Sequence, residues 1–188
     1  MPNYCNYSMR VVGKETNVDE FIKIIQTDYH FDDNGQCNVD RHFWRVFEAD
    51  VTDEDITDGI KSATIQGYCA WSVYSCMFDG PHTYQGDHSN PKDGGTTLQL
   101  ESARLHLDIE VFSEETGCCF MEHYLIRNGK IEIDDCVDFY EYCIDNYATV
   151  EEMNSDLGTD ITQEEFDYAN EECDGYICRG GIEWNFTI

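Results

Sequence analysis

The sequence has little positive charge. Among its 188 residues, 39 Asp and Glu face 11 Lys and Arg, which gives a formal net charge of −28 at pH 7. A chain of this charge repels nucleic acids and anionic membranes, and it attracts basic protein surfaces. We therefore expect no direct nucleic-acid binding and no membrane binding, and we expect a basic protein surface as the partner.

The sequence also lacks long apolar runs and metal or phosphate motifs. No run approaches the length of a membrane span, and the opening MPNYCNYSMR contains no apolar signal segment. We therefore expect a cytoplasmic protein whose ten cysteines are reduced and mostly serve as small core residues. Without a C-x-x-C pair we expect no structural zinc and no cofactor. Cys173 and Cys178 with a distant histidine stay open as an alternative metal site.

Enough apolar material is present for a packed core, because 41% of the residues are hydrophobic and 13% are aromatic. Apolar residues at helical spacing (Val18, Phe21, Ile22 and Ile25) predict a helix that Asn17 caps. Aromatic and β-branched runs, together with a pair joined through SEETG, predict strands at Tyr4–Val12, His42–Val51, Tyr68–Phe78, Leu105–Phe112 and Cys119–Ile126.

Three stretches within residues 1–135 carry a family resemblance: MPNYCNYSMRVVG before a helix, then YCAWSVYSC, then LHLDIEVFSEETGCCFMEHYLIRNGKI. They resemble the YubB ferredoxin-like, or Api92-like, family of plasmid and prophage proteins. Tyr4 stands where that family has tryptophan, and its Gly-Thr-Lys-Trp signature is present only as Trp71-Ser72-Val73-Tyr74. The resemblance implies an α+β, ferredoxin-like antiparallel sheet with helices on one face, and an origin in a mobile element. It implies no catalytic residues.

Charge is concentrated in the last third of the chain. Residues 131–188 contain 17 acids and one base, Arg179, whereas residues 1–130 contain 22 acids and ten bases. We expect residues 1–130 to form the ferredoxin-like core. Residues 131–188 are expected to form an acidic helical portion that packs on this core and ends in a strand, GGIEWNFTI.

Two amphipathic helices are predicted in this acidic portion. At helical spacing, the apolar residues of 134–147 share one face and its acids share the other. In 164–174, Phe166, Ala169 and Cys173 lie together opposite the acids, and the capping-box spacing of Thr162 and Glu165 places the helix start near Ile161. The predicted partner-binding residues are Asp134, Asp135, Asp138, Glu141, Asp145, Glu151, Glu152, Glu164, Glu165, Asp167, Tyr168, Glu171, Glu172 and Asp174.

Such faces are unusual because solvated helix faces normally mix both charges. Like charges one helical turn apart cost about 0.2–0.5 kcal/mol each, so ten such contacts cost about 2–5 kcal/mol. Carboxylates about 5–6 Å apart approximate the charge field of a short DNA duplex, which a Lys/Arg groove accepts. The sequence thus predicts a phage or mobile-element inhibitor, not an enzyme. It would act as a DNA mimic against a CRISPR nuclease or a restriction enzyme.

Other classes fit less well. Halophilic adaptation would spread the acids evenly, and DVTDEDITDG places Asp58 where a calcium loop needs glycine. A metal-dependent enzyme has a candidate pair in Asp108 and Glu110, but such alternating acids usually form the solvent side of a strand. His82 and His88 in a polar loop are weak metal candidates. An interaction protein for another basic DNA-binding protein stays open as the alternative.

Overall fold

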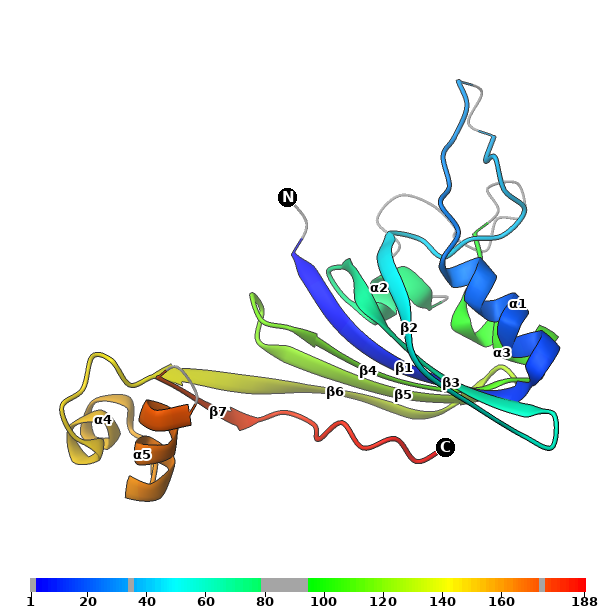
Figure 1. Ribbon diagram of the computed structural model, residues 1–188. Helices are drawn as coiled ribbons and strands as arrows, with labels where there is room; N and C mark the ends of the chain where they lie inside the picture. Colours follow the sequence, from blue (N-terminus) through cyan, green and yellow to red (C-terminus); the bar gives the residue numbers. More distant parts are fainter. Residues whose placement is uncertain (1–2, 34–35, 79–94, 173–174) are drawn as a thin grey trace. The chain divides into compact units, whose positions relative to one another are not determined.

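The computed structural model describes residues 3–33, 36–78, 95–172 and 175–188. The chain is an α+β protein with a seven-stranded antiparallel sheet of order β2-β3-β1-β4-β5-β6-β7. Five helices accompany it in the described part of the chain (Figure 1). The elements are β1 Tyr4–Lys14, α1 Glu15–Ile25, β2 Val46–Thr57, β3 Ile60–Ala70, α2 Val73–Met77, α3 Leu98–Leu105, β4 Asp108–Glu115, β5 Phe120–Arg127, β6 Lys130–Cys143, α4 Val150–Leu157, α5 Gln163–Glu172 and β7 Tyr176–Gly180.

The chain divides into two compact units. The first unit comprises Met1–Cys136 and Ile182–Ile188, and the second unit is the intervening segment Val137–Gly181. Strand β6 therefore begins in the first unit and ends in the second. Among the described residues no helix is both long and apolar enough to cross a membrane.

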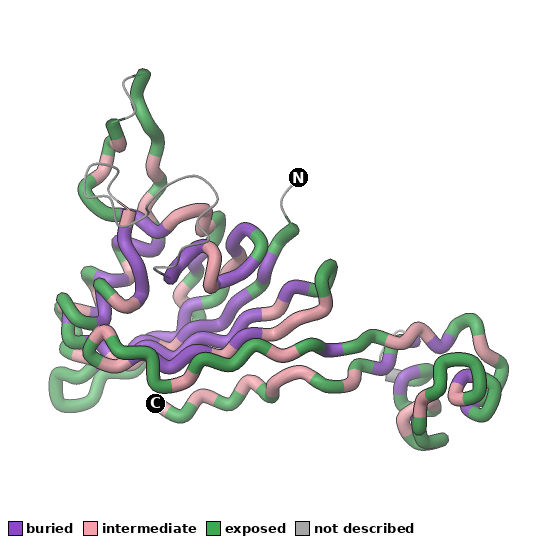
Figure 2. The backbone as a smooth tube through the Cα atoms, turned by 180° about the vertical axis from the view of Figure 1, so that it is seen from behind, coloured by how far each residue is buried: buried purple, intermediate pink, exposed green. Residues whose placement is uncertain are grey.

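The main core of the first unit lies on one face of its sheet. Alternate residues of β1 (Cys5, Tyr7, Met9 and Val11) are buried, as period-two alternation requires of a strand with one covered face. The apolar stripe of α1 (Val18, Phe21, Ile24 and Ile25) is buried in the same cluster. The helices of this unit lie on this face, and Figure 2 shows the buried positions along the strands.

The C-terminal segment Ile182–Ile188 lies against the other face of the first unit (Figure 1). The ring of Phe186 contacts Phe112 at 5.3 Å between centroids, and the guanidinium of Arg10 lies 4.7 Å from the Phe186 ring. The main-chain N–H of Thr187 donates to Glu110 at 2.6 Å. This segment therefore covers part of the sheet face opposite the described helices of the first unit.

The second unit has a small core of its own. Its core cluster consists of Ile144, Val150, Met153, Ile161, Ala169 and Ile177, and Phe139 on β6 is buried as well. Strand β7 pairs antiparallel with the end of β6, with Tyr142 opposite Ile177. A unit of about 45 residues with so few buried side chains has little hydrophobic stabilisation, so it tolerates little additional charge repulsion.

The strand signals at the start of the chain and around SEETG are confirmed by β1 and by the antiparallel pair β4–β5. The predicted helix after β1 is also confirmed, but Lys14 occupies its N-cap in place of Asn17. The strand predicted at His42–Val51 is observed later, as β2 Val46–Thr57. The prediction of a strand at Tyr68–Phe78 is wrong, because β3 ends at Ala70 and α2 follows. Ser72 begins α2 by accepting the Ser75 N–H, which stops the strand there.

The helix predicted for 134–147 is wrong, because this segment forms β6 as far as Cys143. Its valine, phenylalanine and tyrosines are residues that strands favour, and pairing with β7 favours the extended form. Helix α4 lies where only a connection between helices was expected. The predicted final strand is also wrong: the strand is β7, and residues 182–188 carry no strand assignment. The loop containing His82 and His88 lies outside the described residues.

Candidate functional site

The second unit gathers carboxylates on its surface. Residues 137–181 contain 13 acids and a single base, Arg179. The described acids of the unit are exposed except Glu165, which is half-buried. We call this set the acidic surface; its clearly exposed members are Asp138, Glu141, Asp145, Glu151, Glu152, Asp156, Asp160, Glu164, Asp167 and Glu171.

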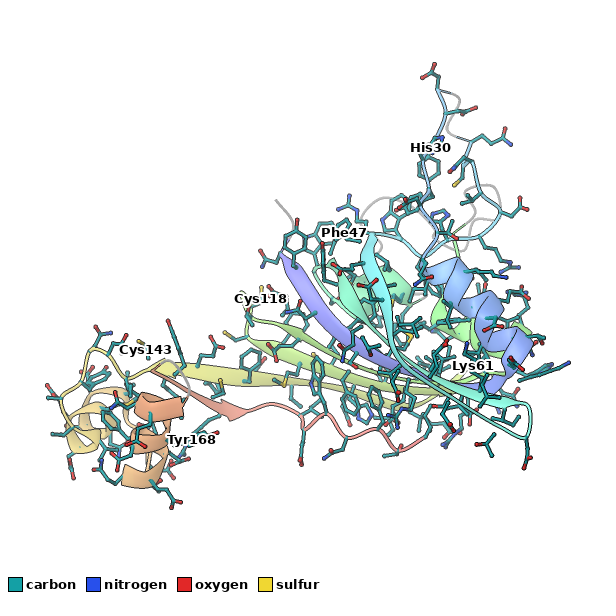
Figure 3. All side chains as sticks on the ribbon, in the orientation of Figure 1. His30, Phe47, Lys61, Cys118, Cys143 and Tyr168 are labelled. Atoms are coloured by element: carbon teal, nitrogen blue, oxygen red, sulfur yellow. The ribbon has the colours of Figure 1, made fainter. Side chains whose placement is uncertain are left out.

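Helix α5 presents acids on its outer face. Ala169 is buried and Phe166 is half-buried, so the helix turns this side to the core of the unit. At 100° per residue, Glu164, Asp167 and Glu171 lie within about 60° of one another on the exposed side. Tyr168 lies beside them with 61% of its surface exposed, and Figure 3 labels it on α5. The face combines three carboxylates with one accessible ring.

The start of α5 is fixed by a reciprocal cap. The Glu165 N–H donates to the Thr162 hydroxyl at 3.2 Å, and the Thr162 N–H donates to the Glu165 carboxylate at 2.7 Å. This confirms the capping box expected from the sequence. The bonds from Thr162, aided by Arg179, lower the pKa of Glu165 below its usual range.

Helix α4 repeats this arrangement. Thr149 accepts the Glu152 N–H at 3.2 Å, and the Glu152 carboxylate accepts the Ala148 N–H at 3.1 Å. Glu151 and Glu152 occupy the first turn, where the positive end of the helix dipole stabilises them. Glu164 and Glu165 have the same position on α5. Part of the acidic surface is thus stabilised locally by helix N-termini.

Arg179 forms its ion pairs within the unit, through its two terminal guanidinium nitrogens. Its guanidinium on β7 binds Asp160, and it donates to the two carboxylate oxygens of Glu165 at 2.8 and 2.7 Å. Among the described residues of the second unit, the ion pairs are those of Arg179 alone. The other carboxylates of the acidic surface have no basic side chain to neutralise them within the unit.

The predicted site residues are only partly brought together. Asp134 and Asp135 belong to the first unit, and along β6 Asp134 and Asp138 point to one face while Asp135 and Glu141 point to the other. The expected single helical face from Asp134 to Asp145 therefore does not exist. Asp145 follows the strand, with its carboxylate close to Gly175. Asp174 lies outside the described residues, as does the side chain of Glu172.

This correction lowers the repulsion that the surface must overcome. On the helices, like charges at i,i+3 or i,i+4 remain for Glu152 with Asp156 and for Asp167 with Glu164 and Glu171. Three such pairs cost about 1 kcal/mol together, below the 2–5 kcal/mol expected for two fully helical faces. The acidic surface is therefore less strained than its sequence suggests.

Elsewhere, carboxylates serve the interior of the first unit. Glu110 is buried, with His123 at 2.9 Å and Thr187 as a second partner, so it is not the solvent-side residue that alternation along β4 predicts. Asp108 shares that face and pairs with Arg127. Among the described residues, no cluster of three or more His, Cys, Asp or Glu side chains is arranged to hold a metal ion.

Comparison with protein-family models, with curated proteins and with solved structures finds no match for this chain. Its function is therefore argued from the acidic surface and from the physical chemistry of that surface.

Proposed function

We propose that the chain inhibits a DNA-targeting defence nuclease of a bacterial host, such as a CRISPR effector or a restriction enzyme, by occupying its basic DNA-binding groove. The observation that carries this proposal is the composition of the second unit, in which 13 acids face one base that is engaged internally. A groove built from Lys and Arg to neutralise phosphates supplies the missing cations.

Binding would lower the electrostatic free energy of both the acidic surface and the basic groove. Binding to a basic groove replaces the repulsion between neighbouring carboxylates with attraction, and long-range steering raises the rate of association at low salt. In an effector that reads a short DNA motif through arginines, those arginines are natural partners for the exposed carboxylates of α4 and α5. Tyr168 is proposed as an interface anchor, because exposed tyrosines often supply binding energy at interfaces.

The proposed origin in a mobile element rests on the sequence resemblance to the YubB ferredoxin-like family, and the fold bears on it through the order of the strands. The connectivity β1-α1-β2-β3-α2-α3-β4, with β1 and β3 between β2 and β4, agrees with the split βαβ arrangement of ferredoxin-like proteins. We propose that this part is the ferredoxin-like core, that it is extended by β5, β6 and the second unit, and that the chain acts in the cytoplasm of an infected or plasmid-bearing cell.

The test is a competition assay on a guide-loaded CRISPR effector. Target-DNA binding is followed with increasing amounts of the chain at low and at high salt. We expect displacement of DNA that weakens as salt rises, because screening shortens the reach of the carboxylates. Cleavage blocked while DNA stays bound would contradict mimicry. Failure at every salt concentration would exclude this target, and the same assay would then be applied to restriction enzymes.

Two triple variants, matched in the number of charges removed, test whether inhibition depends on the acids of the second unit. Glu151→Gln, Glu164→Gln and Glu171→Gln remove three exposed charges from the second unit. The control removes three exposed charges from the first unit through Asp33→Asn, Asp40→Asn and Asp58→Asn. At about 0.2–1 kcal/mol per surface charge, the first set should weaken inhibition by about three- to 150-fold. Equal losses from both sets would show that only net charge matters. Complete loss from any single substitution would favour a metal-dependent enzyme.

A further inference from the structure

The face of the first unit that carries no helices has an exposed aromatic cluster at the end where β1 and β2 begin. We call Tyr4, Phe47 and Tyr68 the aromatic patch. The ring centroids of Tyr4 and Tyr68 are 5.2 Å apart, and those of Tyr4 and Phe47 are 5.8 Å apart. Cross-strand aromatic contacts stabilise a sheet. Tyr4 and Phe47 nevertheless have 59% and 48% of their surfaces exposed, so the rings of the patch are accessible to a binding partner.

Phe47 is placed in the patch by a bulge. Val46 lies opposite Cys69 and Glu48 lies opposite Tyr68, so Phe47 is the extra residue of β2. Figure 3 labels Phe47 at the start of this strand. Bulges redirect side chains and are often retained for that purpose. Gly67 permits the bulge, because a Cβ there would lie 1.9 Å from the carbonyl oxygen of Glu48. Glycine thus occupies the position on β3 that faces the bulge at Phe47.

Two bulky residues beside the patch have left-handed backbone. Arg45 and Trp71 have φ values of 53° and 66°, a region that few residues other than glycine adopt. The guanidinium carbon of Arg45 lies 4.5 Å from the centre of the Trp71 ring. Trp71 is held in place by its N–H, which donates to the Asn3 carbonyl at 2.9 Å. Strained backbone of this kind is often kept where a surface has a function, and here it already holds one guanidinium on one ring.

The surroundings of the patch favour a cation. A hollow of about 280 Å³ borders Phe47 and lies between the end of α1 and the start of β2. Among the described residues, its lining includes Asp28, Glu48 and Asp50 but no Lys or Arg, and the C-terminal end of α1 adds partial negative charge. The phenol of Tyr68 is close enough to Glu48 for that carboxylate to raise its pKa. Aromatic faces next to carboxylates attract guanidinium groups more than they attract any neutral group.

We propose that the aromatic patch and the adjacent hollow form a docking surface for an arginine side chain on a basic protein partner. The guanidinium stacks on Phe47 and Tyr4, and its N–H groups reach the carboxylates of Glu48 and Asp50. Arginine fits better than lysine, because its planar, weakly hydrated guanidinium stacks on rings and forms paired hydrogen bonds with carboxylates. The inference rests on the proposed function in one respect, namely that the arginine belongs to the same basic partner.

A second copy of the chain is a poor occupant of this surface. Among the described strands β2 lies at the edge of the sheet. It exposes Glu48, Asp50, Asp53, Glu54 and Asp55, and pairing two such edges would bring these carboxylates together. The formal net charge of −28 adds general repulsion between copies. A basic partner avoids both costs.

The test compares octa-arginine with octa-lysine as fluorescent probes of the full chain at 150 mM salt. The two peptides have the same charge, so the acidic surface attracts them similarly, whereas stacking on rings favours arginine. We expect octa-arginine to bind more tightly. Phe47→Ser combined with Tyr4→Ser should weaken octa-arginine binding by about three- to tenfold and leave octa-lysine nearly unchanged.

The matched control is Ile56→Ser, because Ile56 lies on the same strand and has a similar exposure of 50%. It should leave the affinities for both peptides unchanged. Phe47→Leu keeps the apolar contact and removes the ring, so it should reduce the preference for arginine even if the serine variants fold poorly. An unchanged preference in folded Phe47→Leu would overturn the proposal, as would an equal loss in Ile56→Ser.

The two proposals fail separately. If the Phe47 variants have no effect on peptide binding but the chain still displaces DNA, the arginine surface is wrong and the mimic stands. If the peptide preference depends on Phe47 but no nuclease is inhibited, the surface stands and the proposed partner is wrong. Sedimentation of the unmodified chain completes the test, because a dimer that Phe47→Ser dissociates would show that a second copy occupies the patch.

Discussion

Four glutamates of the first unit (Glu101, Glu110, Glu115 and Glu122) are buried, with at most 3% of their surfaces exposed. Each has specific partners; Glu101, for example, accepts from the Thr96 hydroxyl and binds Arg41 and Arg104. A buried carboxylate is tolerated only with such partners. These four buried glutamates serve the fold, and the exposed acids are the ones available to attract a partner.

Glu122 makes the stability of the first unit depend on pH. Burial raises its pKa, although the Ser113 hydroxyl at 2.6 Å and the Val73 N–H at 2.9 Å favour the charged form. Because the pKa is raised in the folded state, the contribution to stability is full below the unfolded value near 4.5 and is lost as pH rises through the folded value. When the pH is raised from 4.5 to 7.5, the free energy of unfolding should therefore fall less in Glu122→Gln than in the unmodified chain.

Urea unfolding at both pH values in high salt measures this difference, because salt suppresses the general repulsion among surface acids. The amide should also cost about 1–3 kcal/mol at either pH, since its NH₂ group meets hydrogen-bond donors. Ser113→Ala is the opposing control. It removes a donor that lowers the pKa of Glu122, so the loss with pH should become steeper. Parallel pH profiles for Glu122→Gln and the unmodified chain would contradict this assignment.

The alternation of residues along a strand predicted which acids share a face of the sheet. It did not predict which of them are buried by another segment of the chain. The spacing of Asp108 and Glu110 correctly places them on one face of β4, yet Glu110 is fully buried. Thr187 and Ile188 donate their N–H groups to it from more than 70 positions along the chain. Local alternation contains no information about so distant a partner, and the aromatic patch was missed for the same reason.

At the scale of elements, β6 and α5 show when the spacing of apolar residues is sufficient to predict a helix. In α5 the apolar spacing and the Thr162–Glu165 box agree, and the helix forms. In 134–147 the helical pattern competes with an alternating pattern that places Val137 and Phe139 on one side. The cap signals that α5 has are missing there, and β7 supplies a pairing partner. Two independent local signals were reliable, whereas one periodic signal was not.

The cap of α5 can be tested directly. Thr162→Ala removes the hydroxyl that accepts the Glu165 N–H, and loss of a threonine cap costs about 1 kcal/mol. Hydrogen exchange in the amides of α5 should therefore accelerate by about fivefold, while that in β1 and β4 of the first unit should not change. Gln163→Ala, at the next position, is the control. It removes the bond that the Gln163 amide donates to Asp167 at 2.7 Å, but the higher helix propensity of alanine offsets this loss, so the change should be nearly neutral.

The effect of Thr162→Ala should also depend on pH. The Thr162 bonds lower the pKa of Glu165 in the folded state. This contribution is therefore present above the unfolded value near 4.5 and is lost as pH falls through the folded value. The difference between Thr162→Ala and the unmodified chain should shrink in acid. Because the main-chain N–H of residue 162 stays in the variant, a difference that stays constant down to pH 2 would show that the Thr162 hydroxyl does not donate to the Glu165 carboxylate.

At the scale of the whole molecule, charge and core are distributed in opposite ways. The first unit contains the large apolar cluster and all but one of the bases, whereas the second has seven buried apolar side chains among its described residues and one base. Composition alone located this contrast in the last third of the chain. The boundaries at Val137 and Gly181 needed the structure, because the chain returns to the first unit through Ile182–Ile188.

This contrast predicts that salt stabilises the chain and that the second unit gains more than the first. Raising NaCl from 0.01 to 0.1 M shortens the Debye length from about 30 to 10 Å and screens the carboxylates from one another. For the three like-charge helical pairs the gain is at most on the order of 1 kcal/mol. Exchange of the amides in α4 and α5 should slow more than exchange in β1 and β4.

The glutamine set at Glu151, Glu164 and Glu171 separates screening from other effects of salt. With three charges fewer, the second unit should be more stable at 0.01 M and should gain less from added salt. The asparagine set at Asp33, Asp40 and Asp58 should leave the salt response of the second unit unchanged. If the two sets respond alike, repulsion acts through the net charge of the whole chain. A smaller response confined to the glutamine set means that repulsion is local to the second unit, where a basic partner would relieve it.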